Sequence, residues 1–186
     1  MPAMVSSDLL VKSEPRWASV HDAAATGFKM LLTSEFPELR GDATQFEWRT
    51  LGCLYDSSGT RIDLSLRENR AGDEQIVSID PKRLPAELLD ADMPCLAGRT
   101  LYLGTFQNHY GHFITESLSR FWWPEAAEGF DHLVAHSFIH DRGQLFVQDF
   151  HRRMTDALGI PVDRMTMLTA PTRVEEIVVP EQLWQL

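Results

Sequence analysis

The chain has 186 residues, of which 44% are hydrophobic and 24% charged, a composition typical of an ordinary soluble globular protein with its own core. Its formal net charge of −10 argues against a general nucleic-acid binder, which needs cations to replace the counterions along the phosphates, and against docking on an anionic membrane surface. A phosphorylated ligand stays compatible with this charge, because one arginine or one helix N-terminus can hold a phosphate.

Neither a secretory leader nor a membrane span is expected. Residues 1–10 lack a basic region followed by a long apolar run. No apolar stretch approaches the roughly 20 residues that a spanning helix needs. Cys53 and Cys95 have no metal-ligand spacing, and two free thiols are typical of a reducing compartment. We therefore expect a cytoplasmic protein, with any membrane association made through a partner.

The first segment with regular structure is predicted over residues 19–98, after a poorly ordered stretch over residues 1–18. Apolar side chains in 20–36 recur at helical spacing, which predicts a helix there. Pro37 then ends it, because proline cannot continue a helix.

Antiparallel strands are predicted to follow in residues 45–80. Aromatic and β-branched residues there alternate with turn signals rich in Asp, Ser and Gly. Residues 62–66 read as a return strand and 76–79 as a further one. A proline-marked connection with a short helix at 86–90 closes this half.

From residue 99 onward strands and helices alternate. Strands are predicted at 99–103, 132–139, 165–168 and 173–179, and helices at 110–123 and 144–158. Such alternation predicts an α/β layer with a largely parallel sheet over 99–186, and the front half becomes an antiparallel β appendage on it.

The most informative stretch is 102–122, YLGTFQNHYGHFITESLSRFW, in which a strand and a glycine-containing loop lead into a Gly-His-Phe helix with an aromatic end. A helix ending Leu-Gly-Ile-Pro at 158–161 and the run PTRVEEIVVP at 171–180 follow in order. Together these pieces resemble glycosyltransferase family 61, and the likeness covers about residues 99–180.

This resemblance implies the Rossmann-like N-terminal half of a GT-B-type glycosyltransferase, with a cleft between two nucleotide-binding-like halves. It implies an enzyme that transfers a sugar from a nucleotide sugar, with inversion and without a further cofactor, to a hydroxyl of a polysaccharide or glycan, as in capsule or surface-polysaccharide synthesis. In such folds the C-terminal half carries most donor contacts. We therefore expect the donor domain to be absent from this chain, and a C-terminal half or partner chain to supply it.

The Gly-His-Phe helix is predicted to carry His112, Glu116, Ser119 and Trp123 along one face. Inverting transfer needs a base that takes the proton of the acceptor hydroxyl, and a histidine or a carboxylate can supply it. We predict that His112 or Glu116 is this base and that the other residue orients it. The alternative is structural: His112 caps the helix and Glu116 pairs with Arg120.

Four further residues are predicted to bind substrate. Asn108 and His109 lie in the loop before the helix, where side chains and free N–H groups can meet a ligand. Arg120 could hold a phosphate or a sugar carboxylate, and Trp123 could stack on a sugar ring. Their structural alternatives are a turn-stabilising asparagine, an ion pair and a core tryptophan.

A rival function depends on His132, His136 and His140, which are spaced four residues apart. On a helix they would share one face and could bind zinc. On a strand they would spread over about 26 Å and could not share one ion. Their apolar neighbours favour the strand, so no metal is predicted. A stand-alone metal-binding domain and a non-catalytic carbohydrate-binding domain remain the alternatives.

Overall fold

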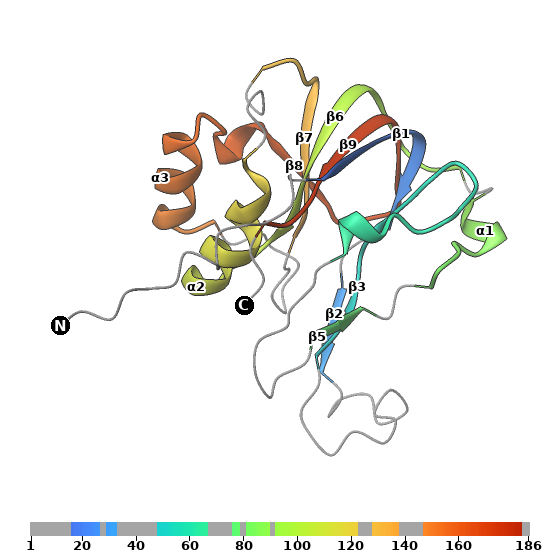
Figure 1. The fold of residues 1–186 in the computed structure, drawn as a ribbon, viewed down its shortest axis with the longest axis horizontal. Coiled ribbons are helices and arrows are strands. Elements are labelled where there is room, and N and C mark those ends of the chain that lie inside the picture. The colour runs from blue at the N-terminus through green and yellow to red at the C-terminus, as the bar shows by residue number, and fades with distance from the viewer. Residues whose placement is uncertain are drawn as a thin grey trace.

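The computed structural model of the chain describes residues 16–26, 29–32, 48–66, 76–78, 81–89, 92–122, 128–137 and 147–183. Its central sheet contains β1 (Trp17–Ala25), β4 (Leu54–Tyr55), β6 (Cys95–Phe106), β7 (His132–Ser137), β8 (Met165–Leu168) and β9 (Thr172–Pro180). These six strands lie in the order β4-β1-β9-β6-β7-β8 (Figure 1).

Four neighbouring strands of this sheet, β9, β6, β7 and β8, are parallel. β1 runs antiparallel to β9, and β4 runs antiparallel to β1. The predicted α/β class is therefore confirmed, as a mixed sheet with a parallel core and an antiparallel margin.

The parallel strands are apolar because both of their faces are covered. On β6, Leu101 and Leu103 belong to a core on one face of the sheet, whereas Tyr102 between them belongs to a core on the other face. On β9, Val178 and Val179 are divided between the two cores in the same way. This alternation explains why these strands read as continuous apolar runs in the sequence.

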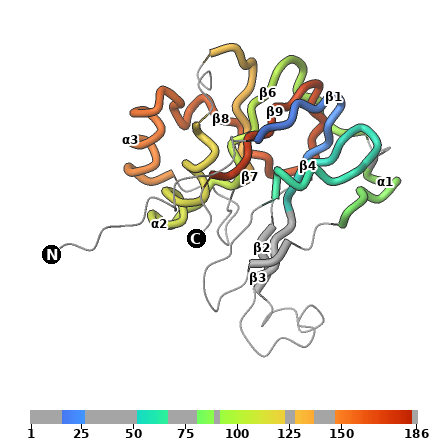
Figure 2. The backbone as a smooth tube through the Cα atoms, in the orientation of Figure 1, coloured from blue at the N-terminus to red at the C-terminus, as the bar shows by residue number. Residues whose placement is uncertain are grey.

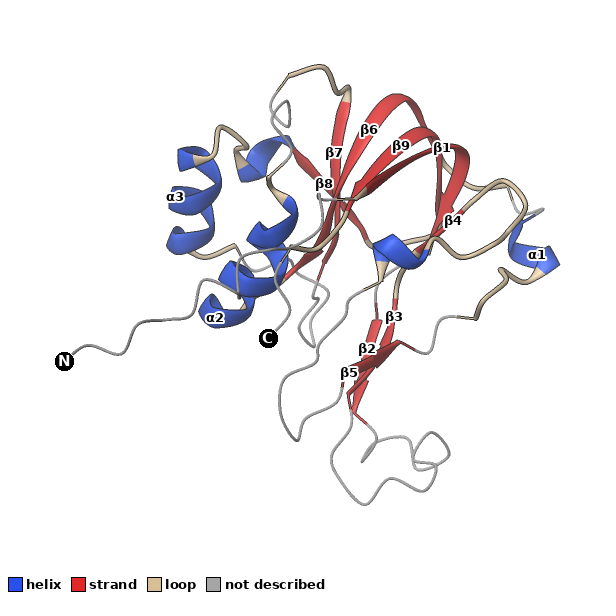
Figure 3. Ribbon diagram, viewed as in Figure 1, coloured by secondary structure: helices blue, strands red, loops and turns tan. Residues whose placement is uncertain are grey.

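Helices cover the first face (Figure 3). α2 (Tyr110–His112) continues as a π-helical turn over Phe113–Ser117 and a 3₁₀ turn over Leu118–Arg120, and α3 (Asp149–Ala157) packs nearby. The core under them includes the fully buried side chains of Phe113 and Ile160.

The second face is covered by β4 and a 3₁₀ turn over Asp63–Ser65, which the tube in Figure 2 draws in teal beside β1. Leu54 from this cover packs in one core with Val134 of β7. A short helix, α1 (Ala86–Leu89), confirms the helix predicted at this place in the connection.

A second, smaller sheet contains β2 (Lys29–Leu32), β3 (Trp48–Leu51) and β5 (Ile76–Ser78). β2 and β3 are antiparallel, but β3 and β5 are parallel. The front half is therefore not the purely antiparallel appendage predicted, and its first strand belongs to the central sheet.

The predicted helix over 20–36 is wrong, because β1 and β2 occupy the part of it that the structure describes. Val20 and Ala24, four residues apart, fit a helix but equally fit one face of a strand. Tertiary pairing decides between them: β1 forms an antiparallel ladder with β9 from Trp17 to Ala25. The same ladder places Trp17 and Ala18, predicted to be poorly ordered, in the sheet.

The predicted return strand at 62–66 is also wrong. Asp63–Ser65 forms a 3₁₀ turn, in which the hydroxyl of Ser65 donates to the carbonyl of Ile62 at 2.7 Å. The same hydroxyl accepts a hydrogen bond from the backbone N–H of Leu54 at 2.9 Å. The Ser65 hydroxyl thus connects β4 to the 3₁₀ turn, at the place where a second strand of the hairpin was predicted.

Candidate functional site

The predicted site begins where β6 ends, in the loop Gln107–His109. α3 fixes this loop from the side. The ring Nε2 of His151 donates to the carbonyl of Gln107 at 2.8 Å, and the amide of Gln148 donates to the carbonyl of Asn108 at 3.1 Å. The loop that leads into α2 is therefore held by hydrogen bonds from the first turn of α3.

The helix after this loop is not one continuous α-helix. In its π-helical turn the N–H of Leu118 donates to the carbonyl of Phe113, five residues earlier. Such turns frequently occur at functional sites. The wider turn changes the predicted polar stripe: His112 is partly exposed, whereas Glu116 and Ser119 are buried. The three described residues of the stripe predicted along one face therefore differ in exposure.

His112 and Glu116 nevertheless meet. The distance between Nδ1 of His112 and Oε1 of Glu116 is 2.5 Å. The histidine side chain is 42% exposed and the carboxylate side chain only 5%. Because an ionised carboxylate can only accept, the proton lies on Nδ1 and the lone pair on Nε2 stays available.

The carboxylate of Glu116 is enclosed on its inner side. Its Oε2 accepts a hydrogen bond from the side-chain amide of Gln107 at 3.3 Å. Beyond it lies a narrow gap, also lined by Thr105 and Arg120, that has no room for a water molecule. An acceptor hydroxyl therefore cannot approach Glu116 from within, and Glu116 is placed to orient His112.

His109 and Asn108, both predicted to bind substrate, lie on opposite sides of the loop. His109 is exposed, and its ring packs edge to face against that of His112 with centroids 5.3 Å apart. Asn108 is buried, and its backbone carbonyl accepts a hydrogen bond from Gln148 at the start of α3. Only His109 of these two borders the solvent side of the His112–Glu116 pair.

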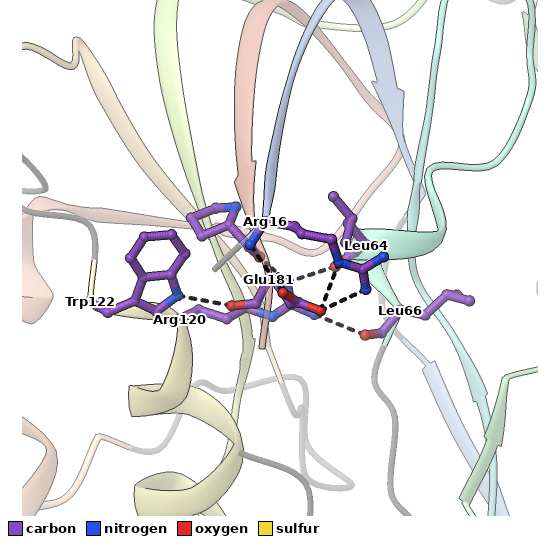
Figure 4. A network of polar contacts seen from close by, with 7 residues as sticks. Arg16, Leu64, Leu66, Arg120, Trp122 and Glu181 are labelled. Atoms are coloured by element: carbon purple, nitrogen blue, oxygen red, sulfur yellow. Dashed lines mark hydrogen bonds and ion pairs between the residues drawn. The ribbon is translucent and has the colours of Figure 1, made fainter. Parts of the chain in front are cut away.

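Arg120 has a structural position in place of the predicted contact with a phosphate or sugar. It is 2% exposed, and its guanidinium donates to the carbonyls of Leu64 at 2.6 Å, Leu66 at 2.9 Å and Pro180 (Figure 4). These carbonyls come from the cover of the second face and from the end of β9. Arg120 thus ties three segments together and is not available to a ligand.

The end of β9 is tied to the neighbouring elements in the same region (Figure 4). The indole N–H of Trp122 donates to the carbonyl of Glu181 at 2.9 Å, and the Glu181 carboxylate forms an ion pair with Arg16 at 2.6 Å. Trp122 therefore has a structural contact. Trp123, predicted to stack on a sugar, lies outside the described residues.

Two of the three histidines of the rival zinc site lie among the described residues, and both are found on a strand, as predicted. His132 and His136 both lie on β7, and His140 lies outside the described residues. His136 is fully buried: Nε2 donates to the carbonyl of Thr26 at 2.7 Å, and Nδ1 lies 2.8 Å from the hydroxyl of Tyr102. Within the described ranges no group of three His, Cys, Asp or Glu side chains could hold a metal.

Burial lowers the pKa of both core histidines. The pKa of His136 falls from 6.5 to about 4, chiefly because a charged ring would be desolvated and secondarily because Arg120 is near. The pKa of His151 is also lowered, because burial desolvates its charged ring. Both rings are therefore neutral at physiological pH and serve as fixed donors and acceptors.

The sequence did not point to Gln107, Gln148 or His151. Gln148 is the N-cap of α3: its backbone carbonyl accepts from the N–H of His151 at 3.1 Å, and its own N–H donates to the ring Nδ1 of His151 at 2.9 Å. Glutamine is not among the residues that signal a helix start, so α3 was predicted to begin too early. No local signal could have linked His151 to Gln107, because the two are 44 positions apart.

Comparison of the chain with protein-family models, curated proteins and solved structures gives no match. None of the helices among the described residues is long and apolar enough to cross a lipid bilayer. The chemistry of the site is therefore inferred from its own geometry, together with the resemblance in the stretch 102–122.

Proposed function

We propose that this chain carries the acceptor side of an inverting glycosyltransferase, with His112 as the general base and Glu116 as the residue that orients it. The observation that carries the proposal is the 2.5 Å contact between a half-exposed imidazole and a buried carboxylate. A structural capping histidine needs no carboxylate partner, whereas a base that must gain a proton is stabilised by one.

The proposed reaction uses the free nitrogen of His112. Nε2 takes the proton of an acceptor hydroxyl while the hydroxyl oxygen attacks the anomeric carbon of the donor sugar. The bond from that carbon to the nucleoside diphosphate breaks, and the diphosphate leaves with the electron pair. The new glycosidic bond forms on the opposite face of the sugar. The imidazolium is stabilised by the carboxylate of Glu116 until the proton passes to solvent.

The family resemblance supports the choice of glycosyl transfer among base-catalysed reactions. It implies that the Gly-His-Phe stretch belongs to an acceptor side and that the nucleotide sugar binds to a second, GT-B-type half or partner. The four parallel strands β9-β6-β7-β8, followed by helices on one face, are compatible with a Rossmann-like half. Neither Cys53 nor Cys95 forms a disulfide among the described residues, which fits a cytoplasmic enzyme of capsule or surface-polysaccharide synthesis.

The test is donor turnover. The chain, alone and with any downstream or partner half that the genome encodes, is incubated with UDP- and GDP-linked sugars and a mixture of oligosaccharide acceptors. Release of nucleoside diphosphate is measured. We expect His112→Ala to lower turnover by about 10²–10⁴-fold and Glu116→Gln by a smaller factor.

The matched control is His132→Ala, since His132 is a partly exposed histidine at the start of β7, opposite Thr100 and so at the other end of β6 from the candidate site. It is expected to keep most of the activity. Unchanged turnover in a folded His112→Ala variant would remove His112 from the chemistry. Absence of turnover with every donor, together with oligosaccharide binding, would instead favour a non-catalytic carbohydrate-binding domain.

A further inference from the structure

An open groove lies at the start of α3, beside the loop that carries the His112–Glu116 pair. It is lined by Val147, Gln148, Asp149, Phe150 and Arg153, and offers about 640 Å³ of space that is open to solvent. That volume is within the range of pockets that hold small molecules or a few sugar units. Neither the resemblance nor the proposed reaction assigns this groove a role.

Two contacts join the groove to the candidate site. Gln148, which lines the groove, donates its side-chain amide to the carbonyl of Asn108 at 3.1 Å. Phe150, which also lines it, packs its ring edge to face on that of Tyr110, with centroids 5.2 Å apart. Tyr110 is the first residue of α2 and is two residues from His112. A molecule in the groove therefore lies next to the segment that carries the proposed base.

The lining combines the partly exposed ring of Phe150 with polar groups of both signs. Tyr110 is not part of the lining, but its ring packs on that of Phe150 and is 53% exposed. Asp149 and Arg153 are exposed on α3, and neither forms a hydrogen bond or an ion pair with another of the described residues. A carboxylate and a guanidinium in one groove leave it without a strong preference for either charge.

This combination fits one class of ligand best. A neutral sugar ring presents apolar C–H groups to an aromatic face, and its hydroxyls both donate to a carboxylate and accept from a guanidinium. For a phosphate or a polyanionic glycan, repulsion by Asp149 offsets the attraction of Arg153, and a purely apolar ligand would desolvate both charges without a partner.

We propose that this groove binds an uncharged segment of the acceptor glycan, next to the unit whose hydroxyl His112 deprotonates. That the bound glycan is the acceptor rests on the proposed function, but the binding of neutral oligosaccharide does not require turnover. The aromatic pair stacks on the sugar, and Asp149 and Arg153 bind its hydroxyls.

The test measures binding of neutral gluco-, xylo-, manno- and N-acetylglucosamine oligomers of four to six units to the whole chain by calorimetry, with oligogalacturonate as the charged comparison. We expect at least one neutral series to bind, and Tyr110→Ala and Arg153→Met each to weaken that binding by about tenfold. The matched control is Arg152→Met, since Arg152 is the adjacent arginine on α3 and pairs with Asp163 at 2.8 Å, so its loss should leave binding unchanged.

Each outcome separates this inference from the proposed function. His112→Ala should bind the neutral oligomer as the unchanged chain does while losing transfer. If no neutral series binds, if oligogalacturonate binds more tightly, or if Tyr110→Ala and Arg153→Met bind normally, the groove is not the glycan site, and the assignment of His112 is unaffected. If His112→Ala binds the oligomer normally and also transfers sugar normally, the proposed function is overturned, whereas the assignment of the groove as a glycan site stands.

Discussion

The buried histidines and the histidine at the rim of α2 differ in what their ring nitrogens contact. In His136 and His151, Nε2 donates to a backbone carbonyl and Nδ1 has a partner as well. In His112, Nδ1 contacts the Glu116 carboxylate and the ring is 42% exposed. A histidine with both nitrogens occupied can only hold the fold together. One with a carboxylate on Nδ1 and an open Nε2 can also take a proton from a ligand.

The two regions also differ in where their polar groups point. On the second face of the sheet, Arg120 and His136 bind backbone carbonyls and are sealed from water. At the start of α2, His109, Tyr110 and His112 retain exposed surface. Stability should therefore depend on the buried polar groups of the second face, and ligand chemistry on the exposed groups at the start of α2. The following substitutions test this difference, from the largest expected effect to the smallest.

Replacement of Arg120 should have the largest effect on folding. Arg120→Met leaves the carbonyls of Leu64, Leu66 and Pro180 without their donor in a buried place. We expect a loss of about 3–5 kcal/mol in the free energy of unfolding, measured by urea denaturation. Arg120→Lys should recover only part of it, because an ammonium lacks the planar fork. A loss below about 1 kcal/mol for Arg120→Met would contradict the structural role.

The pH dependence of stability should reveal His136. Its pKa is lowered from 6.5 to about 4 in the folded chain, so between these values the unfolded chain binds a proton that the folded chain does not. Stability is therefore full above pH 6.5 and falls as the pH decreases toward 4, by about 3 kcal/mol. Urea midpoints across this range should show the loss, and His136→Asn should remove most of it.

The matched control for that pH series is Val134→Ala, a buried and non-titrating substitution on the same strand, which should lower stability at every pH and keep the decrease between pH 6.5 and 4. If His136→Asn leaves the slope unchanged, the burial of a neutral imidazole on the second face is not its cause.

Alanine substitutions at two glycines distinguish the cost of a strained backbone from the cost of a steric clash with Arg120. Gly104 and Gly129 both have positive φ, at 78° and 82°. A Cβ at Gly104 would lie 2.5 Å from Cδ of Arg120, whereas nothing lies within 4 Å of one at Gly129. We expect Gly129→Ala to cost about 1 kcal/mol of folding free energy and Gly104→Ala at least about 2 kcal/mol, measured by thermal denaturation. Equal losses would mean that Arg120 can move aside.

His112→Ala should have a small effect on stability. Its ring is half exposed and contributes no buried apolar contact on the scale of the core, so the main cost is the donor that the buried Glu116 carboxylate loses, about 1 kcal/mol in the free energy of unfolding. Circular dichroism and urea denaturation check this. A large loss would identify His112 as a structural cap and weaken its assignment as a base.

Local patterns predicted much of the second half of the chain. β8 is found at the predicted residues 165–168, and β9 extends the predicted strand by one residue at each end. A strand covered on both faces is a continuous apolar run, which is visible without any knowledge of its neighbours. The front half was predicted less well, because β1 is specified by its ladder with β9, more than 140 positions away.

The candidate site shows the same limit. The pairing of His112 with Glu116 could be predicted from a spacing of four residues, since both helical geometries bring such side chains near each other. The burial of Glu116 could not, because it depends on the π-helical turn and on Gln107 and Arg120. Nor could the structural role of Arg120, whose three acceptors lie 54 to 60 positions away.

The central claim is that the free nitrogen of His112 is Nε2, and the ring-nitrogen chemical shifts of the ¹⁵N-labelled chain near pH 8 test it most directly. The structure requires His136 and His151 to carry their proton on Nε2, and these two rings act as internal references. We expect His112 to show the opposite tautomer, protonated on Nδ1, and to lose that preference in Glu116→Gln. A His112 ring protonated on Nε2 in the unchanged chain would contradict the account.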